Sequence, residues 1–272
     1  MSKFRTLAAA TLIACVHTAG WSATFYSGST NNTLVKFDTD TGIGTVIGPM
    51  GFGGIFAGAF SPTGTFYTVT NTYAEPTVDV PSPSSLATVN LATGQATPIA
   101  SLPRNDIDML QFSSSGTLYA SQGSALYTVN IGTGALTRIG AFGGFGDMMD
   151  LAVDSAGRMF GVADPNNNTS PSRFYSIDTS TGAATFLFQT TEPCIMGLAF
   201  DGADNLFGTR FCGTQSSPFY KIDLAAKSVS VVGLSGIPNP HGGDIFRAPE
   251  PGTLALLGLG LAGLAATRRR KQ

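Results

Sequence analysis

The sequence predicts an all-β fold: a β-propeller of five blades, each with four antiparallel strands. A short motif recurs five times along the chain, and each copy combines two short strands with a tight turn. No long stretch between the two ends has helical periodicity, and the low charged fraction of 12% with 34 glycines suits short strands and close turns. Repeats of this kind at 40 to 52 residues are typical of propeller blades.

The recurring motif is an aromatic or aliphatic strand that ends on Asp or Asn, then a turn that ends near glycine, then a second strand. Its marker residues are Asp38, Asn90, Asn130, Asp178 and Asp223, which are 52, 40, 48 and 45 residues apart. A further pair of strands precedes four of these motifs. The turn within that pair lies around Gly64, Gly116, Gly157 or Asp204. Each complete unit therefore supplies four strands.

The two ends of the repeat array predict how the ring closes. The first unit lacks its opening strand, and the last unit leaves a strand around 244–246 without a partner. Pairing of this last strand with the first blade gives five blades and no free sheet edge. An open or six-bladed arrangement is the alternative.

The longest connections predict a difference between the two ends of the ring. Residues 71–85, 164–172 and 211–218 all join the second strand of a blade to the third, so they share one face. Long connections on one face of a repeat ring mark a binding face, unless the face is simply free to vary in length.

The C-terminal segment has the order of a sorting signal. The triplet Pro249, Glu250 and Pro251 precedes an apolar run over 253–266, and a basic end follows: Arg268, Arg269, Arg270 and Lys271. This order resembles the PEP-CTERM sorting signal of Gram-negative bacteria. The resemblance implies that an exosortase, a membrane-embedded protease-transpeptidase, removes the tail during delivery to the envelope, the cell surface or an exopolysaccharide matrix of the kind found in biofilms.

The length of the apolar run fits a transient membrane helix. As a helix its roughly 14 residues span about 21 Å, which is less than a hydrocarbon core of about 30 Å. The basic end is expected to stay cytoplasmic, so the rest of the chain lies outside the inner membrane. An ordinary C-terminal anchor or a buried helix is the alternative.

The N-terminus also predicts export. Lys3 and Arg5 precede a short apolar segment over 7–16, the pattern of a secretory signal helix. Cleavage is expected after Gly20 or Ala23, with lipidation at Cys15 as the alternative. The chain then divides into a signal peptide (1–23), a propeller domain (24–247) and a sorting signal (248–272).

The charge of the exported domain limits its partners. Residues 24–247 contain 9 basic and 16 acidic residues, a net charge of about −7. A negative surface argues against nucleic acid and anionic lipid as partners. Contact with the membrane is expected only through the C-terminal helix, before processing.

The two cysteines outside the leader predict a disulfide. If a hairpin turns through 201–205, the numbers of paired residues sum to 406, which places Cys194 opposite Cys212. An oxidising exterior favours their bond, worth about 3 kcal/mol for a loop of this length. Two reduced thiols are the alternative.

A group of carboxylates is the main candidate site. They fall just before or within the first strands of the blades, which line the channel of a propeller: Asp106, Asp108, Asp147, Asp150 and Asp244. Several carboxylates at one channel mouth suit Ca²⁺, which takes six to eight oxygen ligands. They also suit a sugar, with aromatic faces from Phe56, Phe142 and Phe145 and a polar tip from His241. The alternative is that these aspartates accept backbone amides and fix turns.

Three classes of function follow from these features. His241 is the single histidine outside the leader, and no nucleophile elbow, HExxH, CxxC or dinucleotide-binding motif occurs, so no catalytic residue is assigned. The favoured function is a non-enzymatic surface or matrix protein that binds a polysaccharide or another surface protein. The alternatives are a metal-dependent glycosidase, lyase or lactonase that uses the channel aspartates, and a structural filler of the matrix.

Overall fold

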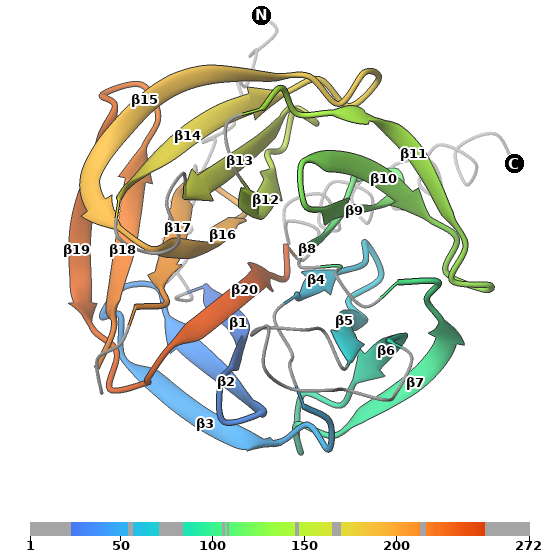
Figure 1. Ribbon diagram of the computed structural model, residues 1–272. Helices are drawn as coiled ribbons and strands as arrows, with labels where there is room; N and C mark the ends of the chain where they lie inside the picture. Colours follow the sequence, from blue (N-terminus) through green and yellow to red (C-terminus); the bar gives the residue numbers. More distant parts are fainter. Residues whose placement is uncertain are drawn as a thin grey trace, which may run out of the picture.

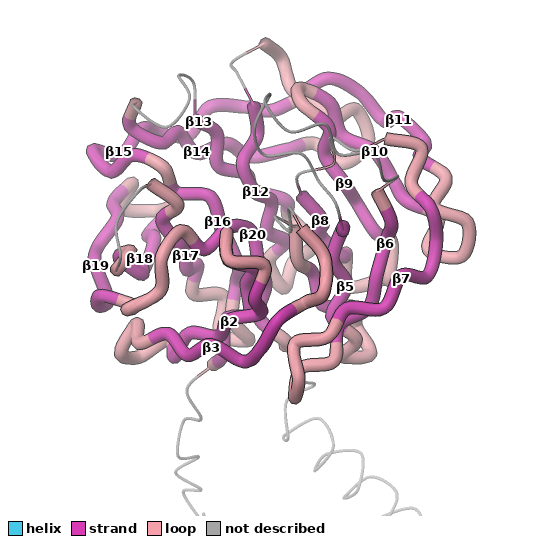
Figure 2. Tube along the Cα trace, turned by 60° about the horizontal axis from the view of Figure 1, so that its bottom comes forward, coloured by secondary structure: helices cyan, strands magenta, loops and turns pink. Residues whose placement is uncertain are grey.

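The computed structural model describes residues 23–53, 57–70, 84–104, 107, 109–144, 147–164, 170–212 and 216–247. These residues form strands, turns and loops and contain no helix (Figure 2). The described part accordingly has no helix long and apolar enough to cross a membrane. The predicted signal helix and sorting helix fall outside the described residues.

Twenty described strands form five four-stranded antiparallel sheets around a common centre, which confirms the predicted five-bladed propeller (Figure 1). Blade 1 consists of β20 (Pro240–Ile245), β1 (Thr24–Ser29), β2 (Thr33–Asp38) and β3 (Gly44–Pro49). Blade 2 consists of β4 (Ala59–Phe60), β5 (Phe66–Thr70), β6 (Ser85–Val89) and β7 (Ala96–Ser101). Blade 3 consists of β8 (Met109–Phe112), β9 (Leu118–Gln122), β10 (Ala125–Val129) and β11 (Leu136–Ala141). Blade 4 consists of β12 (Asp147–Val153), β13 (Met159–Asp164), β14 (Pro171–Ile177) and β15 (Ala184–Pro193). Blade 5 consists of β16 (Ile195–Phe200), β17 (Leu206–Arg210), β18 (Pro218–Asp223) and β19 (Ser228–Leu234).

The last strand closes the ring as the repeat pattern predicts. β20 pairs antiparallel with β1, so that Phe25 lies opposite Ile245 and Tyr26 lies opposite Asp244. Every residue of β20 is buried. This pairing satisfies the edge of β1 that would otherwise be open to another chain.

The marker residues of the repeat build the turn between the third and fourth strands of each blade. Asp38 is typical: its Oδ1 accepts the amides of Asp40 at 3.0 Å and Thr41 at 2.9 Å, a local bond that competes with strand pairing and so favours a turn. Gly42 then takes a φ of +72°, which a side chain disfavours. Asn90, Asn130 and Asp178 accept amides in the same way.

Small residues let neighbouring blades approach closely at the outer edge. A Cβ on Gly140 in blade 3 would lie 1.8 Å from the carbonyl oxygen of Thr181 in blade 4, so no side chain fits there. Equivalent contacts join Gly48 to Thr93 and Gly233 to Thr41. Deeper between the blades the packing is aromatic, as where the rings of Phe37 and Phe219 stack 5.4 Å apart between blades 1 and 5.

The register of the strands defines two faces of the ring. We call the end that carries Ala23, Phe246 and the turns between first and second strands the terminal face. The pairing of Phe25 with Ile245 places both ends of the domain there. We call the opposite end, where second strands connect to third strands and each blade connects to the next, the loop face. The longest connections fall on the loop face, in part beyond the described residues.

Candidate functional site

The first strands of the blades surround the centre of the ring: β20, β4, β8, β12 and β16 (Figure 1). Two of the predicted channel aspartates lie in these strands with their side chains fully removed from water. Asp150 in β12 is 0% exposed, and Asp244 in β20 is 4% exposed. A buried carboxylate needs partners for both oxygens, so the partners identify the role of each.

Each of these carboxyls joins two neighbouring blades. Asp150 accepts the amide of Leu151 in its own strand at 2.9 Å and the amide of Leu198 in blade 5 at 2.7 Å. Asp244 accepts the amide of Ile245 at 2.8 Å and the amide of Phe60 in blade 2 at 2.8 Å. All four carboxylate oxygens therefore accept hydrogen bonds from backbone amides. The sequence left this role open as the alternative to a metal or sugar site.

Burial raises the pKa of both carboxyls above the ordinary value for aspartate. Desolvation raises the pKa of Asp244 to about 7, although the amides of Phe60 and Ile245 and the charge of Arg247 act in the opposite direction. Desolvation also raises the pKa of Asp150 well above its ordinary value, and the charge of Asp244 raises it further. The channel therefore brings these two residues within electrostatic reach of each other.

The other predicted site residues do not join this pair in the described structure. Asp147 is exposed at the start of β12, where it lies opposite Asp164. His241 lies near the start of β20, toward the loop face. Phe142 is 1% exposed in the core, so the predicted aromatic face is not available to a ligand. Asp106, Asp108, Phe56 and Phe145 lie outside the described residues.

Calcium binding remains a prediction. Among the described residues, no three His, Cys, Asp or Glu side chains gather in a way that could hold a metal ion. The predicted cluster also depended on Asp106 and Asp108, which the structure does not describe. The oxygens of the two described members, Asp150 and Asp244, already accept hydrogen bonds from backbone amides.

Sequence reasoning missed a pocket at the channel mouth on the terminal face. It has a volume of about 260 Å³, and all five blades contribute to it: Phe60, Gln111, Ser155, Gly202 and Phe246 represent one blade each. Gln111 is 2% exposed, and its Oε1 has no hydrogen-bond partner in the described structure. No sequence motif marks this glutamine; its position in a first strand is the only available signal.

The end of the domain borders this pocket. Phe246 packs on Phe60 with ring centroids 5.5 Å apart, and the Arg247 guanidinium donates a hydrogen bond to the carbonyl oxygen of Val153 in blade 4. The residues that follow β20 are thus attached to two other blades. Pro249 comes two residues later, so the predicted sorting triplet begins close to the folded domain.

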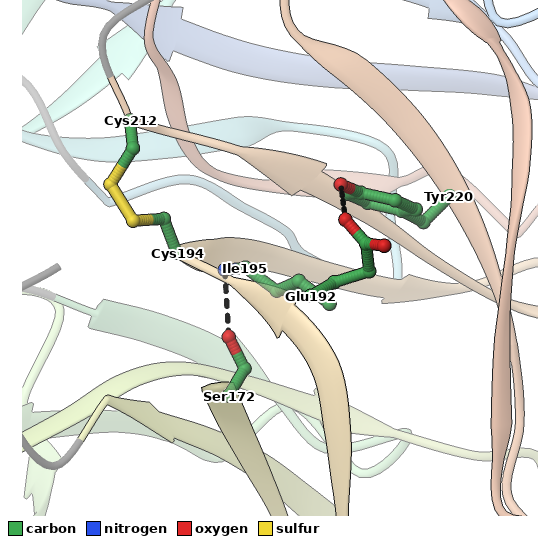
Figure 3. The surroundings of a disulfide bond; sticks show 6 residues. All are labelled: Ser172, Glu192, Cys194, Ile195, Cys212 and Tyr220. Atoms are coloured by element: carbon green, nitrogen blue, oxygen red, sulfur yellow. Dashed lines mark hydrogen bonds between the residues drawn. A yellow bond between two sulfur atoms is a disulfide. The ribbon is translucent and has the colours of Figure 1, made fainter. Parts of the chain in front are cut away.

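The loop face carries the predicted disulfide. Cys194 and Cys212 are bonded, with Cα atoms 5.7 Å apart (Figure 3). The expected register holds from Gly197 to Phe200, but a bulge between Ile195 and Gly197 shifts the pairing by one residue. Cys194 therefore accepts the amide of Phe211 rather than lying directly opposite Cys212.

Polar bonds next to the disulfide connect blades 4 and 5. Ser172 Oγ accepts the amide of Ile195 at 3.0 Å, and the Tyr220 hydroxyl donates to Glu192 Oε2 at 2.8 Å (Figure 3). Burial raises the pKa of Tyr220, and so does the bond to Glu192. Nearby, the rings of Phe211 and His241 meet edge to face at 5.2 Å. Phe211 is half-buried, which leaves part of an aromatic ring on the loop face.

The fold and its terminal signal define an exported protein with a five-bladed propeller domain. Residues 247–271 match the family model of the PEP-CTERM protein-sorting motif. The motif implies export and processing by an exosortase, with a membrane-anchored stage before cleavage. The match begins at Arg247, a residue that is bonded to the propeller.

Comparison with solved structures supports the fold alone. A chain of the crystal structure of a Nidogen/Laminin complex is 12% identical, with a TM-score of 0.54 over 83% of this chain and 98% of that chain. A chain from work on the de novo evolutionary emergence of a symmetrical protein is 18% identical, with a TM-score of 0.50 over 80% of this chain and 100% of that chain. No curated protein matches the sequence.

Proposed function

We propose that this protein is a binding module of the cell surface or extracellular matrix, and that its loop face takes an extracellular polysaccharide or a surface protein. The observation that carries the proposal is the pairing of Phe25 with Ile245, which puts both ends of the domain on the terminal face. The loop face is then the end of the ring that both terminal signals leave free.

The short distance to the membrane segment strengthens this orientation. Five residues lie between Arg247 and Thr253, where the apolar run starts, and the six Cα-to-Cα steps of this segment reach at most about 20 Å when fully extended. Before processing, the terminal face is therefore held toward the membrane and the loop face points away from it. This orientation makes the loop face accessible throughout delivery.

Chemistry on the described part of the loop face fits such a role. The disulfide and the Tyr220–Glu192 bond hold this part of blades 4 and 5 rigid, and rigid supports preserve the shape of a binding surface. The half-buried ring of Phe211 supplies an aromatic contact. The net charge of about −7 between residues 24 and 247 favours neutral or cationic partners over anionic polymers.

The metal-dependent enzyme is the weaker proposal. A propeller glycosidase, lyase or lactonase needs carboxylate oxygens that can reach a metal or a substrate. Asp150 and Asp244 use their oxygens to hold backbone amides, which supports a structural role for both. The matrix filler differs from a binding module in having no saturable partner.

The test is co-sedimentation of the exported protein with exopolysaccharide and with surface protein from the same cells. We expect saturable retention that Phe211→Ser weakens. The matched control is Ile43→Ser, which changes a 59% exposed apolar residue in a turn of the terminal face and should leave retention unchanged. Saturable retention that Phe211→Ser leaves unchanged would contradict binding at this part of the loop face, and non-saturable retention would favour the matrix filler.

A further inference from the structure

The first strand of blade 1 ends differently from the other four first strands. In the other blades a turn leads from that strand directly into the second strand, after Phe60, Phe112, Val153 and Phe200. β20 has no such turn, because its partner β1 comes from the beginning of the domain. The chain therefore leaves the ring after Ile245, near the centre of the terminal face (Figure 1).

Phe246, the first residue after β20, lies against blade 2. Its ring packs on the ring of Phe60 with centroids 5.5 Å apart. It also lies over the turn between β4 and β5, where a Cβ on Gly64 would come within 3.0 Å of the Phe246 ring. The aromatic ring is therefore in close contact with blade 2, although it is 38% exposed.

Arg247, the next residue, is held by blades 4 and 5. Its guanidinium donates a hydrogen bond to the carbonyl oxygen of Val153, and the residue is half-buried. Its charge also interacts with Asp204 in blade 5: the Ser155 hydroxyl is the main cause of the lowered pKa of Asp204, and Arg247 acts in the same direction. The two residues that follow β20 thus contact blades 2, 4 and 5, an arrangement that only the closed ring provides.

These contacts lie close in sequence to the point of processing. Arg247 is the first residue of the matched sorting motif, and Pro249 comes two residues later. A cut that removes the whole apolar run falls before Thr253, so at most five residues separate it from Arg247. A protease that needs a free segment around the cut acts on the fraction of molecules in which that segment has detached. Contacts that hold the segment to the domain reduce this fraction.

We propose that Phe246 and Arg247 are positioning residues for exosortase processing: they hold the start of the sorting signal against the terminal face and thereby slow its cleavage. The proposal rests on processing of the sorting signal and is independent of partner binding on the loop face. Because only the closed ring makes these contacts, folding of the propeller lengthens the membrane-anchored stage.

The experiment is a pulse-chase measurement of the full chain in its own cells, which follows conversion of the anchored form to the processed form. Phe246→Ala leaves the matched motif intact and should speed conversion roughly two- to tenfold, as expected for loss of one aromatic pair. Arg247→Ala should speed it roughly tenfold, through loss of a hydrogen bond from a charged group. The control Phe186→Ala changes a 54% exposed phenylalanine on β15 and should leave the rate unchanged.

A spacer distinguishes this restraint from a general loosening of the domain. A flexible Gly/Ser insert of about eight residues between Arg247 and Ala248 keeps both contacts but moves the cut away from the ring. This chain should be processed faster than the parent, and adding Phe246→Ala to it should have no further effect. The proposal is overturned if Phe246→Ala and Arg247→Ala are processed at the parent rate or more slowly. It is also overturned if Phe246→Ala speeds processing equally with and without the spacer.

Discussion

The Asp244 carboxyl, in the strand that closes the ring, accepts the backbone amide of Phe60 in the next blade at 2.8 Å. This bond joins blade 1 to blade 2 across 184 residues of sequence. Asp150 makes the corresponding bond from blade 4 to blade 5. Both carboxyls are buried in the channel, so the central contacts of the ring depend on groups whose charge changes with pH.

Stability should therefore fall as the pH rises through the neutral range. The unfolded chain loses the Asp244 proton near pH 4, whereas the native chain keeps it to about pH 7. The contribution of this group is fully present below pH 4 and is lost between about pH 4 and 7, by up to roughly 4 kcal/mol. Asp150 acts in the same direction.

Urea unfolding between pH 5 and 8 measures this effect. Asp244→Asn should reduce the pH dependence to the part that Asp150 contributes, because the asparagine side chain does not titrate. The exposed Asp147→Asn should keep the parent's slope. An unchanged slope in Asp244→Asn would contradict the role assigned to the buried carboxyl.

Removal of β20 should open the ring. A chain that ends at Asn239 lacks the fully buried strand and the Asp244–Phe60 bond, and it exposes the edge of β1. We expect loss of cooperative unfolding or association into larger species, measured by circular dichroism and size-exclusion chromatography. A chain that ends at Arg247 should stay monomeric and cooperative. Equal behaviour of the two chains would show that closure does not stabilise the fold.

The disulfide should stabilise the domain by about 3 kcal/mol, because the bond between Cys194 and Cys212 restricts the unfolded chain over 18 residues of separation. Reduction with dithiothreitol should lower the urea midpoint by the corresponding amount. Cys194→Ser/Cys212→Ser should start at that lower midpoint and show no further response to the reductant. A parent protein that is insensitive to reduction would contradict this contribution.

The close approach of blades 3 and 4 should make Gly140 intolerant of a side chain. Gly140→Ala places a Cβ 1.8 Å from the Thr181 carbonyl oxygen, so the two backbones must move apart, at a cost of about 2 kcal/mol or more. Gly132→Ala is the matched control, since its Cβ would meet nothing closer than 3.6 Å. Thermal unfolding compares them, and a similar melting temperature for both variants would refute the steric argument.

The blade architecture could be predicted because local chemistry repeats. Asp38 and its equivalents fix turns through bonds within three residues, so the pattern is visible in the sequence itself. The unpaired strand around Asp244 likewise predicted ring closure, and the hairpin register predicted the disulfide. The bulge beside Ile195 was not predicted, because no residue type in the sequence pattern marks a one-residue shift of the strand register.

The candidate site was less predictable because its contacts are distant in sequence. Asp150 and Asp244 were placed in the correct strands, but their partners Leu198 and Phe60 are backbone amides of other blades, which no pattern of side chains reveals. Gln111 matters only because the closed ring buries its amide. Phe142 was expected to offer an aromatic face to a ligand, but its side chain is buried in the hydrophobic core.

The most direct test of the exported, sorted propeller is the intact mass of the protein isolated from its own cells, read together with its terminal sequences. The account predicts a chain that begins near Thr24, contains the Cys194–Cys212 bond and lacks the apolar run and basic end that follow the Pro249–Pro251 triplet. A chain that keeps its leader and continues to Gln272 would contradict export followed by exosortase processing.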